Sequence, residues 1–246
     1  MLIFSIICIA PKINSQTYFL ENKGRLPSFV QYSAETSGGI IYFNKNGYTV
    51  LMKDTRMYDS LWAHIHKYKS LQHNFSVNWH RFDVEFAGAN LSDIKPKNQF
   101  ITKYNFYKGN LPAKWHTNLK SFESITYQNI YPSIDWRIES LLQTVKHSFI
   151  LKPGSDPNNI KINYSHTDAM RIEKGNLIIS SSVGQIIEQK PLAYQIINND
   201  TVLVECNYIL RKNKQKFELS YLLSKYNEAF ELVIDPILVF STYSGS

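Results

Sequence analysis

The stretch "MRIEKGNLIIS" (Met170–Ser180) consists of a run that alternates between apolar and polar residues, a Lys-Gly-Asn turn and a second, mainly apolar run. The same plan recurs in "AYQIINNDTVLVEC" (Ala193–Cys206) and in "YILRKNKQKFELSY" (Tyr208–Tyr221). Alternating runs of this length, bounded by Gly, Asn, Asp or Lys turns, are typical of β-hairpins. Three hairpins in succession decide the fold class, which we predict to be all-β and mainly antiparallel.

The first half of the chain carries the pattern in shorter runs. "IIYF" (Ile40–Phe43) and "YTVLMK" (Tyr48–Lys53) flank a turn whose Asn46-Gly47 pair suits a tight hairpin with positive φ. Strands at intervals of about 8–12 residues with polar turns predict a β-sandwich-like arrangement. Strands do not alternate with helices, which argues against a doubly wound α/β fold.

Residues 17–240 are predicted to form one β-rich domain, and its final strand is expected over Ile234–Phe240. Apolar residues fall at helical spacing between Asp54 and Asn74, where we expect a short helix or an irregular excursion. A subdomain break near residues 120–125, giving two packed β subdomains, is the alternative organisation.

Composition and charge describe a globular protein. Of 246 residues, 43% are hydrophobic and 19% charged, and the net charge is +7. The lysines are scattered rather than gathered in a basic block, and no nucleic-acid reader motif accompanies them. We therefore expect no nucleic-acid partner.

Residues 1–16 resemble a signal peptide. Leu2–Ala10 is an apolar run that is too short to span a membrane, and polar residues with a plausible cleavage point after Gln16 follow it. The usual positive n-region is missing, so the first residue is expected to lie inside a longer signal. The segment predicts a secreted or cell-surface protein without a transmembrane span. After its removal one cysteine remains, Cys206, which we expect to be a buried structural thiol.

Three sets of residues suggest chemistry. The histidines between His64 and His80, with Asp83 and Glu85 beyond them, are a candidate metal site of a metal-dependent hydrolase. A carboxylate pair is conceivable for glycoside hydrolysis; the candidates are Asp135, Glu139, Glu188 and Asp235. In both sets a structural role is the stronger interpretation. Motifs for phosphate binding, nucleophile elbows and zinc helices are absent from the sequence, so no catalytic residue, metal ligand or cofactor is assigned.

Of the four tryptophans, Trp115 is the candidate for ligand contact. It lies in the loop-like stretch "GNLPAKWHTN", where an exposed ring would stack on a sugar, whereas Trp136 lies within a strand run and is expected in the core. Carbohydrate binding by a β surface is accordingly an alternative function.

Several segments, in the expected order over nearly all of the mature chain, resemble one family. They are "ENKGRLP", "FAGAN", "YNFYKGN", "WHTN", "YQNIYPSID", "FILKPGSDP", "VGQIIEQKPLAYQ" and "IDPILVFSTYSG". The chain resembles an N-terminal domain of unknown function that precedes SBBP-type β-propeller repeats in secreted and surface proteins of Bacteroidota-like bacteria. The family usually has Gly where Ser133 stands, which predicts a change in that turn, and residues 54–74 match it little.

The resemblance implies a module without enzymatic activity at the head of a long surface protein, and it transfers no site residue. Residues 241–246 are then expected to begin a propeller repeat. We predict a non-catalytic, exported structural or interaction module of a β-propeller protein that acts in adhesion or surface display, with type IX secretion as a route. The expected partners are the C-terminal propeller repeats and surface glycans or proteins.

Overall fold

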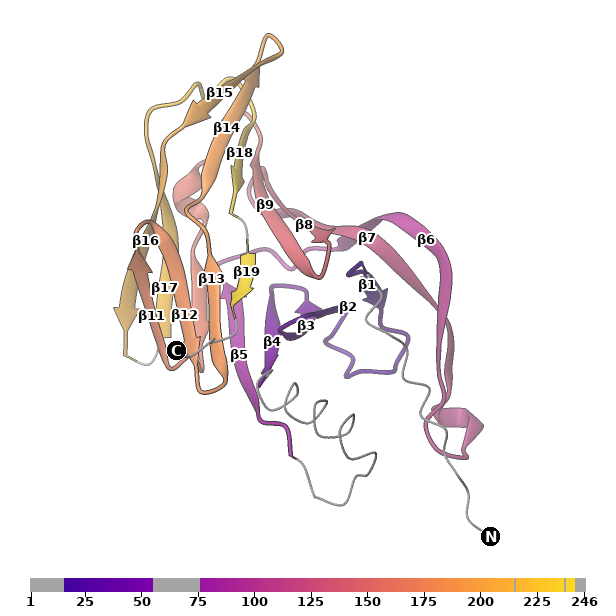
Figure 1. Ribbon diagram of the computed structural model, residues 1–246. Helices are drawn as coiled ribbons and strands as arrows, with labels where there is room; N and C mark the ends of the chain where they lie inside the picture. Colours follow the sequence, from indigo (N-terminus) through magenta and orange to yellow (C-terminus); the bar gives the residue numbers. More distant parts are fainter. Residues whose placement is uncertain (1–15, 55–75, 215, 237, 242–246) are drawn as a thin grey trace.

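The computed structural model describes residues 16–54, 76–214, 216–236 and 238–241. Strands dominate these residues, and the prediction of an all-β, mainly antiparallel fold is confirmed (Figure 1). In the first half the strands are β1 (Phe19–Glu21), β2 (Tyr32–Thr36), β3 (Gly39–Asn44), β4 (Gly47–Lys53), β5 (Trp79–Phe86), β6 (Ile94–Phe106), β7 (His116–Tyr131), β8 (Ile134–Leu141) and β9 (Thr144–Leu151).

The second half continues the antiparallel series. Its strands are β10 (Ile162–Ser165), β11 (Ala169–Glu173), β12 (Asn176–Ser181), β13 (Gly184–Glu188), β14 (Leu192–Ile197), β15 (Asp200–Val204), β16 (Cys206–Asn213), β17 (Lys216–Leu223), β18 (Leu232–Asp235) and β19 (Leu238–Ser241). Two 3₁₀ turns, η1 (Pro112–Lys114) and η2 (Pro157–Asn159), interrupt the connections.

The strands form a large sheet and a small one. The large sheet has the order β15-β14-β18-β9-β8-β7-β1-β2-β3-β4-β5-β10-β17-β16, with β6 paired on β7 as a side branch. Its two end strands, β15 and β16, are consecutive in the chain, so the sheet curls until it is nearly closed. The small sheet has the order β11-β12-β13-β19.

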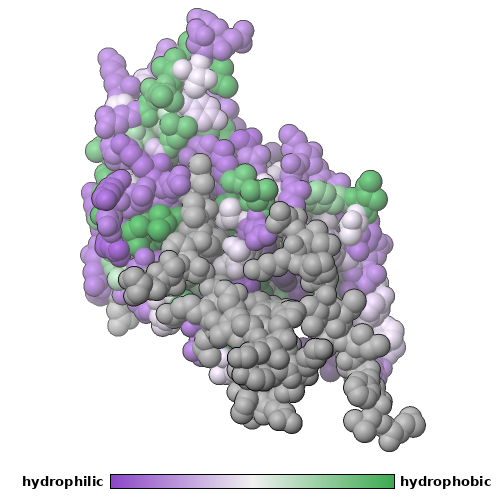
Figure 2. Space-filling view, viewed as in Figure 1, coloured by the Kyte–Doolittle hydropathy of each residue, from purple (hydrophilic) through white to green (hydrophobic). Residues whose placement is uncertain are grey.

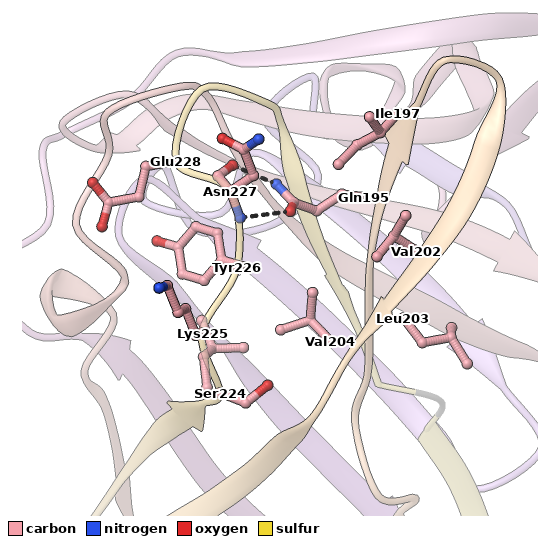
Figure 3. A pocket seen from close by; sticks show the side chains of 11 residues that line it. Gln195, Ile197, Val202, Leu203, Val204, Ser224, Lys225, Tyr226, Asn227 and Glu228 are labelled. Carbon is pink, nitrogen blue, oxygen red and sulfur yellow. Dashed lines mark hydrogen bonds between the residues drawn. The ribbon is translucent and has the colours of Figure 1, made fainter.

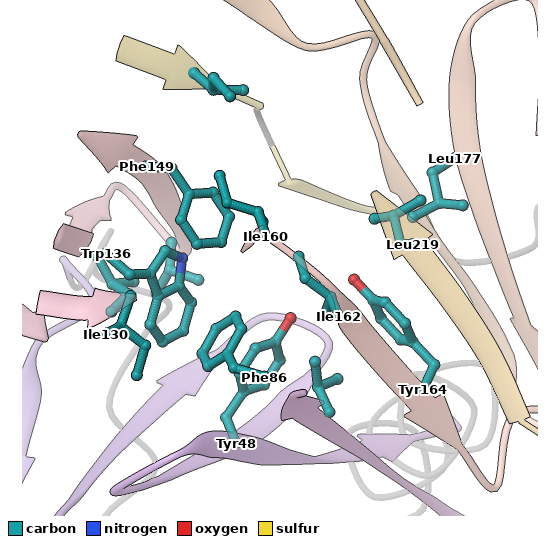
Figure 4. Close-up of a cluster of buried hydrophobic side chains, with 14 of the residues drawn as sticks. Tyr48, Phe86, Ile130, Trp136, Phe149, Ile160, Ile162, Tyr164, Leu177 and Leu219 are labelled. Atoms are coloured by element: carbon teal, nitrogen blue, oxygen red, sulfur yellow. The ribbon is translucent and has the colours of Figure 1, made fainter. Parts of the chain in front are cut away.

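One hydrophobic core joins the two sheets. Trp136 on β8 lies at its centre, with the ring of Tyr48 stacked at 5.5 Å and that of Phe86 edge-on at 4.6 Å (Figure 4). Leu177 of the small sheet belongs to the same cluster and lies beside Leu219 of the large one. Alternate residues of β9 are buried in this core: Val145, His147, Phe149 and Leu151.

The turn between β3 and β4 differs from the prediction. Asn44 pairs with Gly47, so Lys45 and Asn46 form the turn, and the Asn46 N–H donates to Asn44 Oδ1 at 3.0 Å. Gly47 is therefore a strand residue, without positive φ. It is required for another reason, because a Cβ at this position would lie 2.0 Å from the carbonyl oxygen of Val84 on β5.

The predicted single strand over Ile234–Phe240 is also wrong. β18 ends at Asp235 and β19 begins at Leu238, and the chain passes from the large sheet to the small one between them. Pro236 stands at this break. Proline lacks the N–H that a continuing ladder needs and so favours the change of sheet.

Two predictions on domain organisation stay open. Residues 120–125, where a subdomain break is expected, lie in the middle of β7. The predicted helix or excursion over Asp54–Asn74 lies, apart from Asp54, outside the described residues.

We predict that Gly47→Ala costs about 3 kcal/mol of unfolding free energy, because the added methyl group meets backbone that only moves with β5. Gly154→Ala is the matched control. Its φ of +75° strains alanine, but nothing lies within 4 Å of the added Cβ, so about 1 kcal/mol is expected. Urea unfolding followed by tryptophan fluorescence measures both, and equal losses would show that close strand approach does not decide the residue at position 47.

Candidate functional site

A cleft of about 780 Å³ opens beside β15, the strand at one end of the large sheet. One wall is the β14–β15 hairpin, and the other is the segment that follows β17, from Leu223 to Glu228 (Figure 3). We consider this cleft the main candidate functional site, and the sequence analysis did not find it.

Local sequence explains why the two walls diverge. Asn198 and Asn199 have φ values of +53° and +69°, which close β14 and β15 with a two-residue turn that suits the twist of a hairpin. Glu205 is the single residue between β15 and β16. Its carbonyl accepts from the Ser224 N–H at 2.9 Å, and its own N–H donates to Ser224 Oγ at 3.1 Å. The walls meet at this point, and the cleft widens with distance from it.

The floor of the cleft is fixed by a buried amide. Gln195 on β14 donates through Nε2 to the Asn227 carbonyl at 2.8 Å, and its Oε1 accepts from the Asn227 N–H at 2.9 Å (Figure 3). These two bonds hold the opposite wall in place, although the chain around Asn227 is not part of a β-strand. The lining is apolar toward the hairpin and polar toward the tip of the far wall; it includes Ile197, Val202, Val204, Tyr226 and Glu228.

The hairpin also presents apolar side chains on its other face. Ile196 is 62% exposed and Leu203 is 67% exposed, and Leu192 is half exposed on the same strand face as Ile196. Apolar surface gathers where β14 and β15 project at the upper end of the molecule (Figure 2). A hairpin with aliphatic groups on both faces beside an open cleft has the character of a contact surface.

Trp115 lies at the tip of a long arm formed by β6 and β7 (Figure 1). Its ring is 40% exposed, and its Nε1 donates to the Gly109 carbonyl at 3.0 Å. The exposed Tyr107 ring stands edge-on to it at 5.3 Å. The exposure expected for Trp115 is therefore present, and Lys108 and Lys114 belong to the same loop.

A chain of polar groups crosses the core. Trp136 Nε1 donates to His147 Nδ1 at 3.1 Å, which places the imidazole proton on Nε2. That nitrogen lies 3.5 Å from Glu188 Oε1, which also accepts from the Tyr208 hydroxyl at 2.7 Å. Glu188 is only 1% exposed. Burial, together with the Glu188 carboxylate, raises the pKa of Tyr208 far above its ordinary value, so this tyrosine stays a proton donor.

The other candidate carboxylates each have a nearby cation. Asp135 lies 3.1 Å from Lys152 Nζ and accepts from the Asn129 N–H at 2.7 Å, which is the backbone-ordering role expected of it. Asp235 lies 2.7 Å from Lys146 Nζ and accepts from Ser148 Oγ at 3.2 Å. Glu139 lies 3.4 Å from Arg137 Nε.

Most of the predicted histidine cluster lies outside the described residues, His64, His66 and His73 included. His80 is on β5, where its ring nitrogens lie 2.7 Å from the His166 carbonyl oxygen and 3.0 Å from Ser182 Oγ. In the described part of the chain no three His, Cys, Asp or Glu side chains gather as metal ligands. The metal site stays a prediction.

Comparison with protein families gives one match. Residues 19–237 match the model of the family described as a domain of unknown function, DUF7948. The chain belongs to this family. The DUF7948 match begins at the first strand, β1, and ends between β18 and β19. Searches of the curated proteins and of the solved structures found no match. Within the described residues, no helix is long and apolar enough to cross a membrane.

Cys206 of the DUF7948 domain is 2% exposed, as the sequence predicts. Burial raises the pKa of its thiol to about 12. The thiolate is the reactive form, so little of it is present at neutral pH. We predict that in a Cys8→Ser background Cys206 does not react with Ellman's reagent at pH 8 until the protein is unfolded in guanidinium. A fast, stoichiometric reaction of the native protein would contradict the burial of Cys206.

Proposed function

We propose that this domain is a non-catalytic, exported interaction module at the N-terminus of a β-propeller-bearing surface or secreted protein, acting in adhesion or surface display. The observation that carries the proposal is the β14–β15 hairpin. It exposes aliphatic side chains on both faces and stands beside an open cleft. Such surface serves contact with a partner better than it serves an isolated fold.

The placement of the acid and base groups supports a non-catalytic role. His147 and Glu188 are sealed in the core, where Trp136 and Tyr208 are their partners. A general acid or base must come within hydrogen-bond reach of a substrate. These two groups instead contribute to stability.

Export is tested in the producing cell. We expect the intact chain to be cleaved by protease added to whole cells, and a chain without residues 1–16 to stay protected inside. Reading the gene beyond the Ser246 codon tests the propeller context, since propeller repeats are expected to follow in frame. Protection of the intact chain, with no export under any condition, would overturn the proposal.

The contact surface is tested with beads that carry the purified chain. We predict that the double variant Ile196→Ser/Leu203→Ser lowers bead attachment to producing cells about tenfold, because the aliphatic contact area is lost. Leu91→Ser is the matched control, since Leu91 is an exposed leucine between β5 and β6 and does not line the cleft. Equal attachment by both variants would remove the hairpin from the proposal.

Carbohydrate binding at the arm tip is a second candidate. Trp115 and Tyr107 expose aromatic rings at right angles, and Lys108 and Lys114 flank them in the loop. Aromatic faces stack on sugar rings, and the lysines favour glycans that carry acidic groups. This arrangement fits a glycan end rather than a deep site.

We predict that a glycan array probed with the labelled chain gives signals that Trp115→Ala lowers about tenfold, through loss of stacking area. Trp79→Ala is the matched control, because Trp79 is a half-exposed tryptophan on β5. An array without binders, or binding that Trp115→Ala leaves unchanged, would refute this function.

A further inference from the structure

We propose that the free edge of β15 binds an extended peptide strand of a partner protein, one with alternating aliphatic side chains and basic residues at its ends. This inference rests on the proposed interaction function and names the partner's chemistry. It follows from the hydrogen-bond alternation of β15, from the residues that line its edge, and from the charge at its two ends.

The turn geometry shows which backbone groups of β15 point outward. Asn198 and Asn199 form a two-residue turn, so Ile197 and Asp200 are the hydrogen-bonded pair that closes it. Hydrogen-bonded and non-bonded pairs alternate along an antiparallel ladder. Thr201 and Leu203, opposite Ile196 and Tyr194, therefore direct their N–H and C=O groups away from β14.

No described strand occupies that side. β15 pairs only with β14, and none of the described loops supplies a backbone hydrogen bond to Thr201 or Leu203. Two N–H groups and two C=O groups are thus spaced along an open edge. Such a row is a template for an added strand.

Three of the other described edge strands, β6, β11 and β16, are protected, whereas β15 and β19, which reads Leu-Val-Phe-Ser at the edge of the small sheet, are not. β6 carries three lysines and a proline, β11 carries Arg171, and β16 carries Arg211 and Lys212. Basic side chains and proline on an edge discourage pairing with another chain. β15 reads Asp-Thr-Val-Leu-Val and has no proline and no basic residue.

The residues around the β15 edge determine which side chains are favoured on the added peptide strand. Val202 and Ile197 line the cleft, Ile196 is exposed on the opposite face of the hairpin, and Leu203 is exposed and also borders the cleft. An added strand directs successive side chains to opposite faces. Aliphatic residues at alternate positions, on the cleft side, therefore gain burial against Val202 and Ile197.

The charge near β15 determines which residues are favoured at the two ends of the added peptide strand. Acidic residues stand at both ends of β15: Asp200 is its first residue and Glu205 follows its last, and both are exposed. Lysine or arginine at the ends of the added peptide strand complements these acidic residues.

The test uses the labelled synthetic peptide Ac-KVTVTVK-NH₂ and the full chain, with fluorescence anisotropy as the readout. We expect saturable binding, and at least about tenfold weaker binding of Ac-EVTVTVE-NH₂ and of a KVTVTVK peptide N-methylated at alternate amides. On binding, hydrogen exchange at the Thr201 and Leu203 amides is expected to slow.

Leu203→Pro removes one outward N–H without removing a ladder bond to β14. We expect it to abolish peptide binding while circular dichroism and the melting temperature stay near those of the parent, and Leu203→Thr, which keeps the N–H, to retain binding within about threefold. Equal binding by the N-methylated peptide, or by Leu203→Pro, would overturn the inference. So would a dimer of the chain that Leu203→Pro dissociates, because a second copy would then be the occupant.

Failure of this inference is distinguishable from failure of the proposed function. If the peptide does not bind while beads still attach to cells in a Leu203-dependent manner, strand addition is wrong and the interaction module stands. If the chain is not exported but the peptide binds as described, the edge site stands and the surface function falls.

Discussion

The fold depends on a buried carboxylate that needs partners from several strands. Glu188 on β13 of the small sheet reaches Tyr208 on β16 and His147 on β9, and His147 accepts from Trp136 on β8. Burial of a carboxyl group is unfavourable unless polar partners of this kind offset the loss of water. A slip of β13 by one residue would turn Glu188 to the opposite face, so this one side chain specifies how the small sheet packs on the large one.

Because of this constraint, the polar residues that stabilise the core differ from the residues that are accessible to a partner. His147 and Glu188, which look catalytic, lie on the core side of their strands, where they join the two sheets. What remains for a partner lies at the periphery, on the β14–β15 hairpin and at the tip of the β6–β7 arm. Both projections are hairpins, whose tips can change without disturbing the core.

Alternation in the sequence predicts strands well because each strand buries one face, as the β9 residues Val145 to Leu151 show. Alternation also predicts the burial of Cys206, and the loop-like context of Trp115 predicts its exposure. Neither the pairing of β1 with β7 nor that of β5 with β10 could be predicted, since these contacts join residues far apart in the chain. The local sequence places Gly47 in a turn, because it does not reveal that Val84 of a third strand, β5, lies against this residue. Ser133 takes the φ of +58° that favours glycine, and the Lys152 N–H donates to its carbonyl, so the two-residue turn persists.

The cleft is a consequence of topology more than of any one loop. β15 and β16 are consecutive strands at opposite ends of one sheet, so the two edges must meet where the chain crosses, at Glu205. β15 runs toward that point, and the segment after β17 runs away from it, so the walls separate with distance from Glu205. Closure would require a further strand between them. The sequence that leaves this edge open is "NNDTVLV" (Asn198–Val204), where a tight turn leads into an edge strand without the basic residues found on β6, β11 and β16.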